Sequence, residues 1–307
     1  MALTDKSFAT GHYDVVIDGA PLTAYVKSVE GGLISATSVE EARGAYHLRD
    51  RHLATRQIEP LSIEFGASGG GWALRYLDKL LSTREHKRFS GRITSGDINF
   101  KQQYQQHFEN ALMTELALPK ADATSKDFAT IKVKLQPELS SFTLGEGPKI
   151  GPRSVDKQKQ WTCSAFRMSL GPFDMSHVIS VEALTFKIGV KAFQQGGFQL
   201  PVYHPTKIEL PKLVFTMPMK YARPVVDWFS SAVGEQGSTD NDYELDGSLE
   251  FLDQSRSKTI YEIEFGEVGP EKMTILKSEA NKNDTMKVKF EAYISRVKPA
   301  KDMAGFL

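Results

Sequence analysis

The sequence predicts a mainly β protein built from two tandem small β-barrel or sandwich domains, each with one flanking α-helix. Two observations lead to this fold class. Landmarks in the first half of the 307-residue chain return in the same order in the second half, which is the signature of a duplicated unit. Each half also contains about six segments with strand-like alternation but a single amphipathic helical segment, a balance that favours a barrel or sandwich with a helix over one open face.

The repeat is an ordered series of matching positions. The tripeptide Ser-Val-Glu occurs at 28–30 and at 180–182, and "TIKVKL" from Thr130 returns as "TMKVKF" from Thr285, a separation of 155 positions. Between these lie pairs separated by 152 or 156 positions: His52 and His204, Leu61 and Leu213, Gly91 and Gly247, Asp97 and Asp253. An ordered series with so little drift in spacing indicates duplication, since two unrelated β-rich segments would match only by chance.

Each copy is expected to begin with a period-2 strand, "YDVVIDG" from Tyr13 or "SAFRMSLG" from Ser164. A second strand and a polar excursion follow, at 37–57 in the first copy and 189–208 in the second. The next strand is "LSIEF" from Leu61 or "KLVFTM" from Lys212. Further alternating segments close each copy, among them "GRITSGDINF", "FATIKVKL", "GSLEFLD", "TIYEIEF", "KMTILKSE" and "TMKVKFEAYISRV".

One helix is predicted after the third strand of each copy. In "WALRYLDKLLS" from Trp72, a single apolar stripe is formed by Leu74, Leu77, Leu80 and Leu81. In "PVVDWFSSAV", Pro224 suits the first helical turn, where its missing N–H would have no intrahelical partner.

These elements define the expected domain organisation. An N-terminal arm occupies 1–10, the first copy of the duplicated domain 11–143, and the second copy 161–297. The segment 144–160, "LGEGPKIGPRSVDKQKQ", is rich in Gly, Pro and charge and is predicted to be a linker, and 298–307 a C-terminal tail.

Composition and charge exclude several classes. The chain is 40% hydrophobic and 25% charged, as in folded soluble proteins, and 38 basic residues balance 38 acidic ones. We therefore expect no sequence-specific nucleic-acid binding. With no apolar run long enough for a membrane helix and no apolar N-terminal segment, we expect no membrane association and no secretion signal. Cys163 is the only cysteine, so an intramolecular disulfide is impossible, which suits a reducing cytoplasm.

The candidate chemical motifs are weak. "GASGG" at 66–70 fits the G-x-S-x-G pattern of a hydrolase nucleophile elbow around Ser68. The chain lacks the alternating strand–helix units that such an elbow serves, and the second copy has no equivalent serine. In "DNDYELDG" from Asp240, alternate acidic residues resemble a calcium loop, but the twelfth position is Phe251 rather than Glu. We expect no catalytic residue, no cofactor and no metal.

The two excursions are the candidate contact sites. "ARGAYHLRDRH" in the first copy is basic, whereas the corresponding "AFQQGGFQLP" in the second carries no charge. Taken alone, the basic segment is an exposed hairpin tip, but its divergence from its counterpart suggests that the two copies meet different surroundings. The candidate inter-subunit contact residues are Arg43, His47, Arg49, Arg51, Gly196 and Gly197.

In order, these landmarks resemble the tail-tube proteins of contractile phage tails and related bacterial contractile injection systems. The resemblance rests on "DVVIDG…SVEGG", "IEPLSIEFG" with its helix and "SGRITSGD" in the first copy. In the second copy it rests on "ALTFKIGVKAFQQGG", "IELPKLVF", "ARPVVDWFSSAV" and "DGSLEFLD". It spans about 12–138 and 164–297, nearly the whole chain.

The resemblance implies a structural protein without enzymatic activity. Six tube-like domains form a ring in that family, so a chain with two copies is expected to form a trimer with pseudo-sixfold symmetry rather than a hexamer, at the inner tube or its baseplate or hub end. Implied partners are further copies and neighbouring tube, hub or spike proteins, with assembly in the cytoplasm and a final place in a phage tail or injection particle. The alternatives are a main tube protein with a duplicated domain, a β-sandwich ligand-binding module, and a serine hydrolase using Ser68.

Overall fold

The computed structural model describes residues 11–22, 24–44, 48–145, 147–151, 161–196, 200–235, 243–277 and 285–298. The expected arm at 1–10, most of the expected linker, the expected tail after residue 298, His47 and Gly197 lie outside the described residues.

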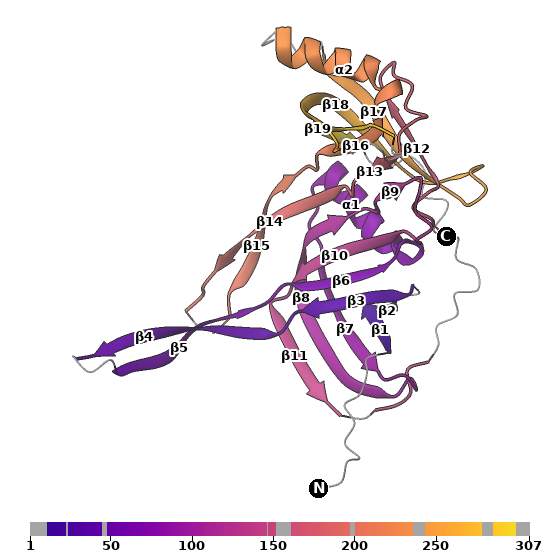
Figure 1. The fold of residues 1–307 in the computed structure, drawn as a ribbon. Coiled ribbons are helices and arrows are strands. Elements are labelled where there is room, and N and C mark those ends of the chain that lie inside the picture. The colour runs from indigo at the N-terminus through magenta and orange to yellow at the C-terminus, as the bar shows by residue number, and fades with distance from the viewer. Residues whose placement is uncertain are drawn as a thin grey trace.

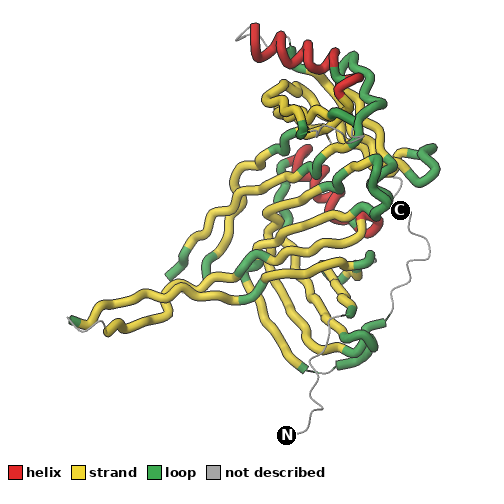
Figure 2. The backbone as a smooth tube through the Cα atoms, viewed as in Figure 1, coloured by secondary structure: helices red, strands yellow, loops and turns green. Residues whose placement is uncertain are grey.

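The described chain is mainly β, with two α-helices, as the sequence predicts (Figure 2). The elements of the first copy are β1 His12–Ile17, β2 Ala20–Pro21, β3 Val26–Gly31, β4 Ile34–Arg43, β5 Leu48–Ile58, β6 Leu61–Gly66, a 3₁₀ turn Ala67–Gly69, α1 Gly71–Thr83, β7 Arg88–Gly96, β8 Gln102–Ala117, β9 Ala121–Asp122, β10 Thr130–Gln136 and β11 Leu139–Leu144. Those of the second copy are β12 Phe166–Leu170, β13 Ser180–Val181, β14 Thr185–Phe193, β15 Val202–Glu209, β16 Leu213–Pro218, a 3₁₀ turn Met219–Tyr221, α2 Arg223–Ser230, β17 Leu245–Leu252, β18 Thr259–Ile275 and β19 Lys287–Lys298.

The two copies have sheets with the same strand order. In the first, the order is β1-β7-β8-β10-β6-β3, and in the second it is β12-β17-β18-β19-β16-β13. Every neighbouring pair in these two series is antiparallel. Figure 1 shows the first sheet in the lower part of the molecule and the second above it. The duplication inferred from the sequence is therefore a duplication of topology.

The hydrogen-bond register gives a residue-by-residue correspondence between the copies. Gly91 lies opposite Phe108, and Gly247 lies opposite Phe265, so β7 and β17 correspond at a shift of 156 and β8 and β18 at 157. In the hairpins, Val39 lies opposite His52 as Lys191 lies opposite His204, a shift of 152 on both strands. A register irregularity also falls at corresponding places in the two hairpins.

For β10 and β19, the register corrects the alignment made from sequence. Ile63 lies opposite Val133, while the corresponding Phe215 lies opposite Phe290, so these strands correspond at a shift of 157 rather than 155. The segments "TIKVKL" and "TMKVKF" are similar in sequence, but the residues that match in sequence are two positions away from those that correspond in the structure. An alternating strand matches itself when it slides by two positions, because every side chain keeps its face.

Structure explains why Gly and Asp recur at the β7–β8 and β17–β18 hairpins. A Cβ on Gly91 would lie 2.2 Å from the Val16 carbonyl oxygen, and one on Gly247 would lie 2.5 Å from the Ser169 carbonyl oxygen, so neither position has room for a side chain. At the turn, one carboxylate oxygen of Asp97 accepts backbone N–H groups of Asn99 and Lys101. Asp253 does the same for Ser257 and Lys258. The backbone hydrogen bond from Lys101 is the main cause of the lowered pKa of Asp97. The Ser255 hydroxyl, followed by the backbone N–H of Lys258, lowers the pKa of Asp253.

The predicted helices are both present. Leu74, Leu77 and Leu80 of α1 are fully buried, and Leu81 packs partly against the core. The helix ends at Arg84, which has a left-handed backbone conformation and donates its N–H to the Leu80 oxygen. The regular part of α2 is shorter than predicted, since after Ser230 the chain continues as a π-helical turn, Ser231–Glu235.

Two hairpins leave the sheets at the predicted excursions. β4 and β5 form a separate two-stranded hairpin that projects away from the rest of the molecule (Figure 1). β14 and β15 form the corresponding hairpin of the second copy, but β14 is also hydrogen-bonded to β8 of the first copy. The domain ranges 11–143 and 161–297 remain a proposal. β14 and β15 of the second range belong to the sheet of the first, and β9 of the first range belongs to the sheet of the second.

Candidate assembly surface

The seam between the copies is an antiparallel strand pair. At the beginning of β14, Phe186 lies opposite Leu116 of β8, and Lys187 lies opposite Glu115. Just beyond the strand ends, the Leu118 N–H donates to the Leu184 oxygen at 2.9 Å. Phe186 is 0% exposed and Leu116 is 1% exposed, so the seam is fully closed. The carboxylate of Glu115 also pairs with Lys134 at 2.7 Å.

Helix α1 spans the same seam. It belongs to the first copy but lies against β19 of the second. The Tyr261 hydroxyl of β18 donates a hydrogen bond to the Asp78 carboxylate of α1. Tyr261 is buried, and that burial together with the nearby negative charge raises its pKa. The helix therefore fixes how the second sheet sits on the first.

Further contacts join the copies where the chain passes from one to the other. β9 pairs with β13, placing Ala121 opposite Val181. The Trp161 carbonyl accepts the Ala129 N–H at 3.0 Å, and its indole stacks on Phe251 at 5.5 Å between ring centroids. The buried apolar side chains of both copies consequently form one contiguous core.

Two strand edges at opposite ends of this arrangement lack a neighbour among the described residues. In that part of the chain, β4 pairs only with β5. The end of β18, from Lys272 to Ile275, pairs only with β19, since β17 reaches no further than Val268. Both edges carry exposed aliphatic side chains, with Ile34 54% and Ile275 57% exposed. Unpaired edges of this kind are templates for another strand.

The predicted contact residues that the structure describes lie on the two hairpins. Arg49 and Arg51 of β5 are exposed and both pair with Glu40 of β4, at 2.7 and 2.6 Å. Arg43 ends β4, and Gly196 follows β14 in open space, where an added Cβ would touch nothing. The structure thus brings two of the arginines together on a hairpin of the first copy and places Gly196 on the second.

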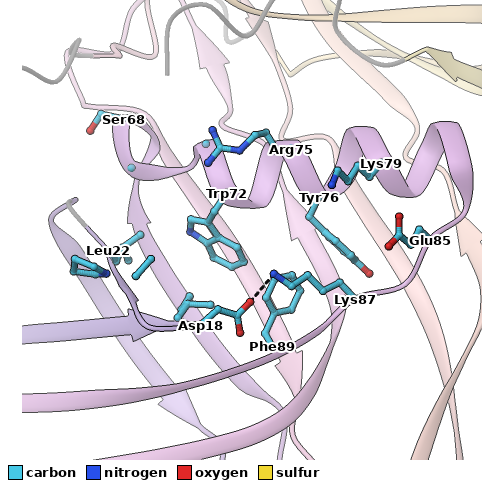
Figure 3. A pocket seen from close by; sticks show the side chains of 15 residues that line it. Asp18, Leu22, Ser68, Trp72, Arg75, Tyr76, Lys79, Glu85, Lys87 and Phe89 are labelled. Atoms are coloured by element: carbon cyan, nitrogen blue, oxygen red, sulfur yellow. Dashed lines mark ion pairs between the residues drawn. The ribbon is translucent and has the colours of Figure 1, made fainter. Parts of the chain in front are cut away.

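A hollow of about 460 Å³ lies beside α1 (Figure 3). Trp72 and Tyr76 of the helix meet Phe89 edge-on, at 5.4 and 5.2 Å between ring centroids. Lys87 pairs with Asp18 at 2.7 Å at the mouth. Burial raises the pKa of Tyr76 to about 12.

Ser68 lines this hollow, on the 3₁₀ turn that precedes α1. A serine nucleophile needs an adjacent base, most often histidine, and no histidine is present among the described residues that line the hollow. Burial and neighbouring carboxylates raise the pKa of the Cys163 thiol, which disfavours the reactive thiolate. No group of side chains suited to a metal ion occurs in the described part of the chain.

None of the helices in the described ranges is long and apolar enough to cross a membrane.

Sequence reasoning missed the seam. Nothing in the local pattern of Thr185–Phe193 distinguishes a strand that pairs within its own copy from one that pairs with the other. A usable signal was present at Ile34 and Phe186, 152 positions apart, which place a large apolar side chain at the same point in each hairpin. The partner strands, in contrast, could be identified only from the sheet register.

No family model matches the sequence, and no curated protein matches it at a significant level. Solved structures do resemble it. A chain of the sheath–tube complex of an extracellular contractile injection system (PVC) is 17% identical, with 46% of this chain and 95% of that chain covered and a TM-score of 0.40. A chain of the anti-feeding prophage baseplate is 16% identical, with coverages of 43% and 90% and a TM-score of 0.38.

Hcp1 from Flavobacterium johnsoniae is 14% identical, with coverages of 43% and 92% and a TM-score of 0.26. In each case nearly the whole neighbour corresponds to less than half of this chain. TM-scores below 0.5 are too low for an argument about function, so the strand pairing of this chain itself must supply that argument. A protein of a type six secretion system is also among the solved structures that resemble this chain, at 16% identity and a TM-score of 0.30.

Proposed function

We propose that this chain is a structural component of a phage tail or contractile injection particle, and that it works by joining tube-like domains side by side into a ring. No catalytic turnover is part of this role. The ring belongs to the inner tube or to its baseplate or hub end, and it contacts further copies and neighbouring tube, hub or spike proteins.

The observation that carries the proposal is the seam between β14 and β8. The second domain contributes β14, the first strand of its hairpin, to the edge of β8 in the first domain. Phe186 and Leu116 lie opposite each other in this pair. The chain is therefore already a joined pair of domains, and the edge of β4 and the end of β18 are left open for a further contact of the same kind. Repeating such a head-to-tail contact produces a closed ring when the rotation closes, and a filament when it does not.

Three chains would supply six domains, giving a trimer with pseudo-sixfold symmetry. The different chemistry of the two hairpins supports this arrangement over a uniform tube. Arg49 and Arg51 mark the hairpin of the first copy, whereas the residues at 192–201 of the second carry no charge. Alternating domains in the ring would thus present alternating surfaces to the layers above and below. Assembly would take place in the cytoplasm before incorporation into the particle.

Mass photometry over a concentration series, with negative-stain images of the same sample, tests this proposal. We expect six-lobed annuli at three times the 34.2 kDa mass of the chain. Six chains in stacked layers would favour the duplicated main tube protein instead. A monomer at every concentration, with no annuli in the images, would contradict the proposed function.

A further inference from the structure

The two open edges occupy the positions that form the seam within the chain. At the hairpin shift of 152, Ile34 corresponds to Phe186 and Ser35 to Lys187, supported by the matching pairs Ser35–Gln57 and Lys187–Glu209. At the shift of 157 between β8 and β18, Leu116 corresponds to Met273 and Leu118 to Ile275. The irregularity after Lys134 in the β8–β10 pair and that after Glu291 in the β18–β19 pair fall at corresponding places, which fixes this second shift.

Burial differs sharply between the corresponding positions. Phe186 and Leu118 are 0% and 1% exposed and belong to the core that the two copies share. Their counterparts Ile34 and Ile275 are 54% and 57% exposed. Aliphatic side chains therefore stand open at the points where the other half of the same chain buries its own.

The backbone at both edges also points outward at matching residues. The Glu59 N–H donates to the Leu33 oxygen at 2.9 Å, so Leu33 faces β5. The Leu276 N–H donates to the Lys287 oxygen at 3.0 Å, so Leu276 faces β19. Facing direction alternates along an antiparallel strand. The N–H and C=O groups of Ile34 and of Met273 consequently point away from their present partners, toward the open edges.

We propose that β4 of one chain pairs antiparallel with the end of β18 of a second copy of this chain, with Ile34 opposite Met273. In this register Leu33 lies opposite Thr274, Ser35 lies opposite Lys272, and Ile275 sits diagonal to Ile34 on the same face. We assign a second copy of this chain to each edge because β4 corresponds to β14 and the end of β18 corresponds to the end of β8. The two open edges are therefore the two sides of a contact that the chain already makes within itself. This inference rests on the proposed assembly function and adds its register.

The helices support the same contact. Tyr104 holds in β8 the position that Tyr261 holds in β18, since Ser95 lies opposite Tyr104 as Phe251 lies opposite Tyr261. Tyr261 is buried beneath α1, whereas Tyr104 is only half-buried beside the exposed Phe142. In the proposed contact, α2 of the second copy would cover Tyr104.

The seam within the chain and the seam between chains differ in charge. Lys187 faces Glu115 within the chain, whereas Ser35 faces Lys272 between chains, and Lys272 already pairs with Glu291 at 3.7 Å. The seam within the chain therefore has a lysine opposite a glutamate, whereas the seam between chains would depend mainly on aliphatic side chains and backbone hydrogen bonds.

Disulfide trapping in a Cys163→Ser background tests the register. Ile34→Cys is mixed with Met273→Cys, each as a single-cysteine variant of the full chain, and oxidised. Opposed Cα atoms of such a pair lie about 5.5 Å apart, within disulfide range. We expect a covalent dimer in the mixture and at least tenfold less in either variant alone.

Two matched mixtures define the register. In the first, Ile275→Cys replaces Met273→Cys. This tests the register with Ile34 opposite Ile275, which would follow if β10 and β19 corresponded at a shift of 155, because Val133 lies opposite Leu116 and Val288 lies opposite Ile275. Ser35→Cys replaces Ile34→Cys in the second, which places the thiol on the other face. We expect at least tenfold less dimer in both. Ile34 and Ile275 are diagonal neighbours, with Cα atoms about 7–8 Å apart, and the side chains at Ser35 and Met273 lie on opposite faces of the sheet.

The outcomes separate the inference from the proposed function. Preferential trapping of Ile34→Cys with Ile275→Cys would overturn the register. Annuli in wild-type protein without trapping in any mixture would overturn the choice of edges while leaving ring formation intact. Absence of both annuli and trapping would overturn the inference and the proposed function together.

Discussion

Gly91 and Gly247 show at the residue scale why parts of the repeat are visible in the sequence. Each sits where the neighbouring strand comes too close for a side chain, with carbonyl oxygens 2.2 and 2.5 Å from where a Cβ would lie. The aspartates six residues later hold the following turns through backbone N–H groups. At these positions the structure requires glycine or aspartate, so both copies have the same residue. The repeat could therefore be recognised from the sequence at these positions.

Gly91→Ala is expected to destabilise the chain by about 1–3 kcal/mol, the usual cost of overpacking. The added carbon would also lie 2.7 Å from the Phe108 ring, which is itself buried. Thermal or urea unfolding measures this cost. Gly196→Ala is the matched control, because an added Cβ there meets nothing within 4 Å. Equal stability of Gly91→Ala and the control would contradict the close packing of β1 on β7.

Tyr76 predicts a dependence of stability on alkaline pH. Burial raises its folded pKa to about 12, above the unfolded value of about 10. Its contribution is fully present below pH 10 and is lost as the pH rises through 12, amounting to about 2–3 kcal/mol. In melting curves from pH 9 to pH 12, Tyr76→Phe should lose less stability than wild type. The exposed Tyr25→Phe should follow wild type, and an unchanged slope in Tyr76→Phe would contradict the burial of this hydroxyl.

At the element scale, the two hairpins share a sequence pattern and a register but differ in what they touch. β14 is buried against β8, whereas the corresponding start of β4 is open. This difference makes one pair of substitutions informative. Phe186→Ala should cost about 3–5 kcal/mol of folding stability, since it empties a fully buried site.

Ile34→Ala should leave the stability of the monomer within about 0.5 kcal/mol of wild type, because Ile34 is 54% exposed. It should nevertheless weaken association. Urea unfolding of dilute protein and the oligomer fraction at high concentration measure the two effects separately. A large loss of monomer stability in Ile34→Ala, or unchanged association, would contradict the assignment of β4 as an open assembly edge.

The sequence allowed the elements to be located but not their partners. Both helices and the hairpin excursions were predicted, because the Leu74, Leu77 and Leu80 stripe and the strand alternation are local patterns. The alignment of β10 with β19 was wrong by two residues, since alternation does not distinguish registers that differ by two. The pairing of β14 with β8 was not predicted either, because strand pairing across about 70 residues leaves no periodic mark in either strand. The contact residues inferred from charge, Arg49 and Arg51, remain a prediction.

At the scale of the whole molecule, the chain is a joined pair of β domains with complementary open edges at its two ends. An unpaired edge that exposes aliphatic side chains invites uncontrolled pairing, and the proposed ring would pair β4 with the end of β18. In the proposed ring, the difference between the two hairpins would give three-fold rather than six-fold chemistry. We therefore expect the ring to close after three chains.

The covalent ladder formed by the double variant Ile34→Cys/Met273→Cys in the Cys163→Ser background tests closure most directly. Oxidised at assembling concentrations and run without reductant, it should give dimers and a dominant final product at three times the 34.2 kDa chain mass. That product should appear as a six-lobed annulus in negative stain. A ladder that continues past the trimer into filaments, or a chain that stays monomeric throughout, would contradict the trimeric ring.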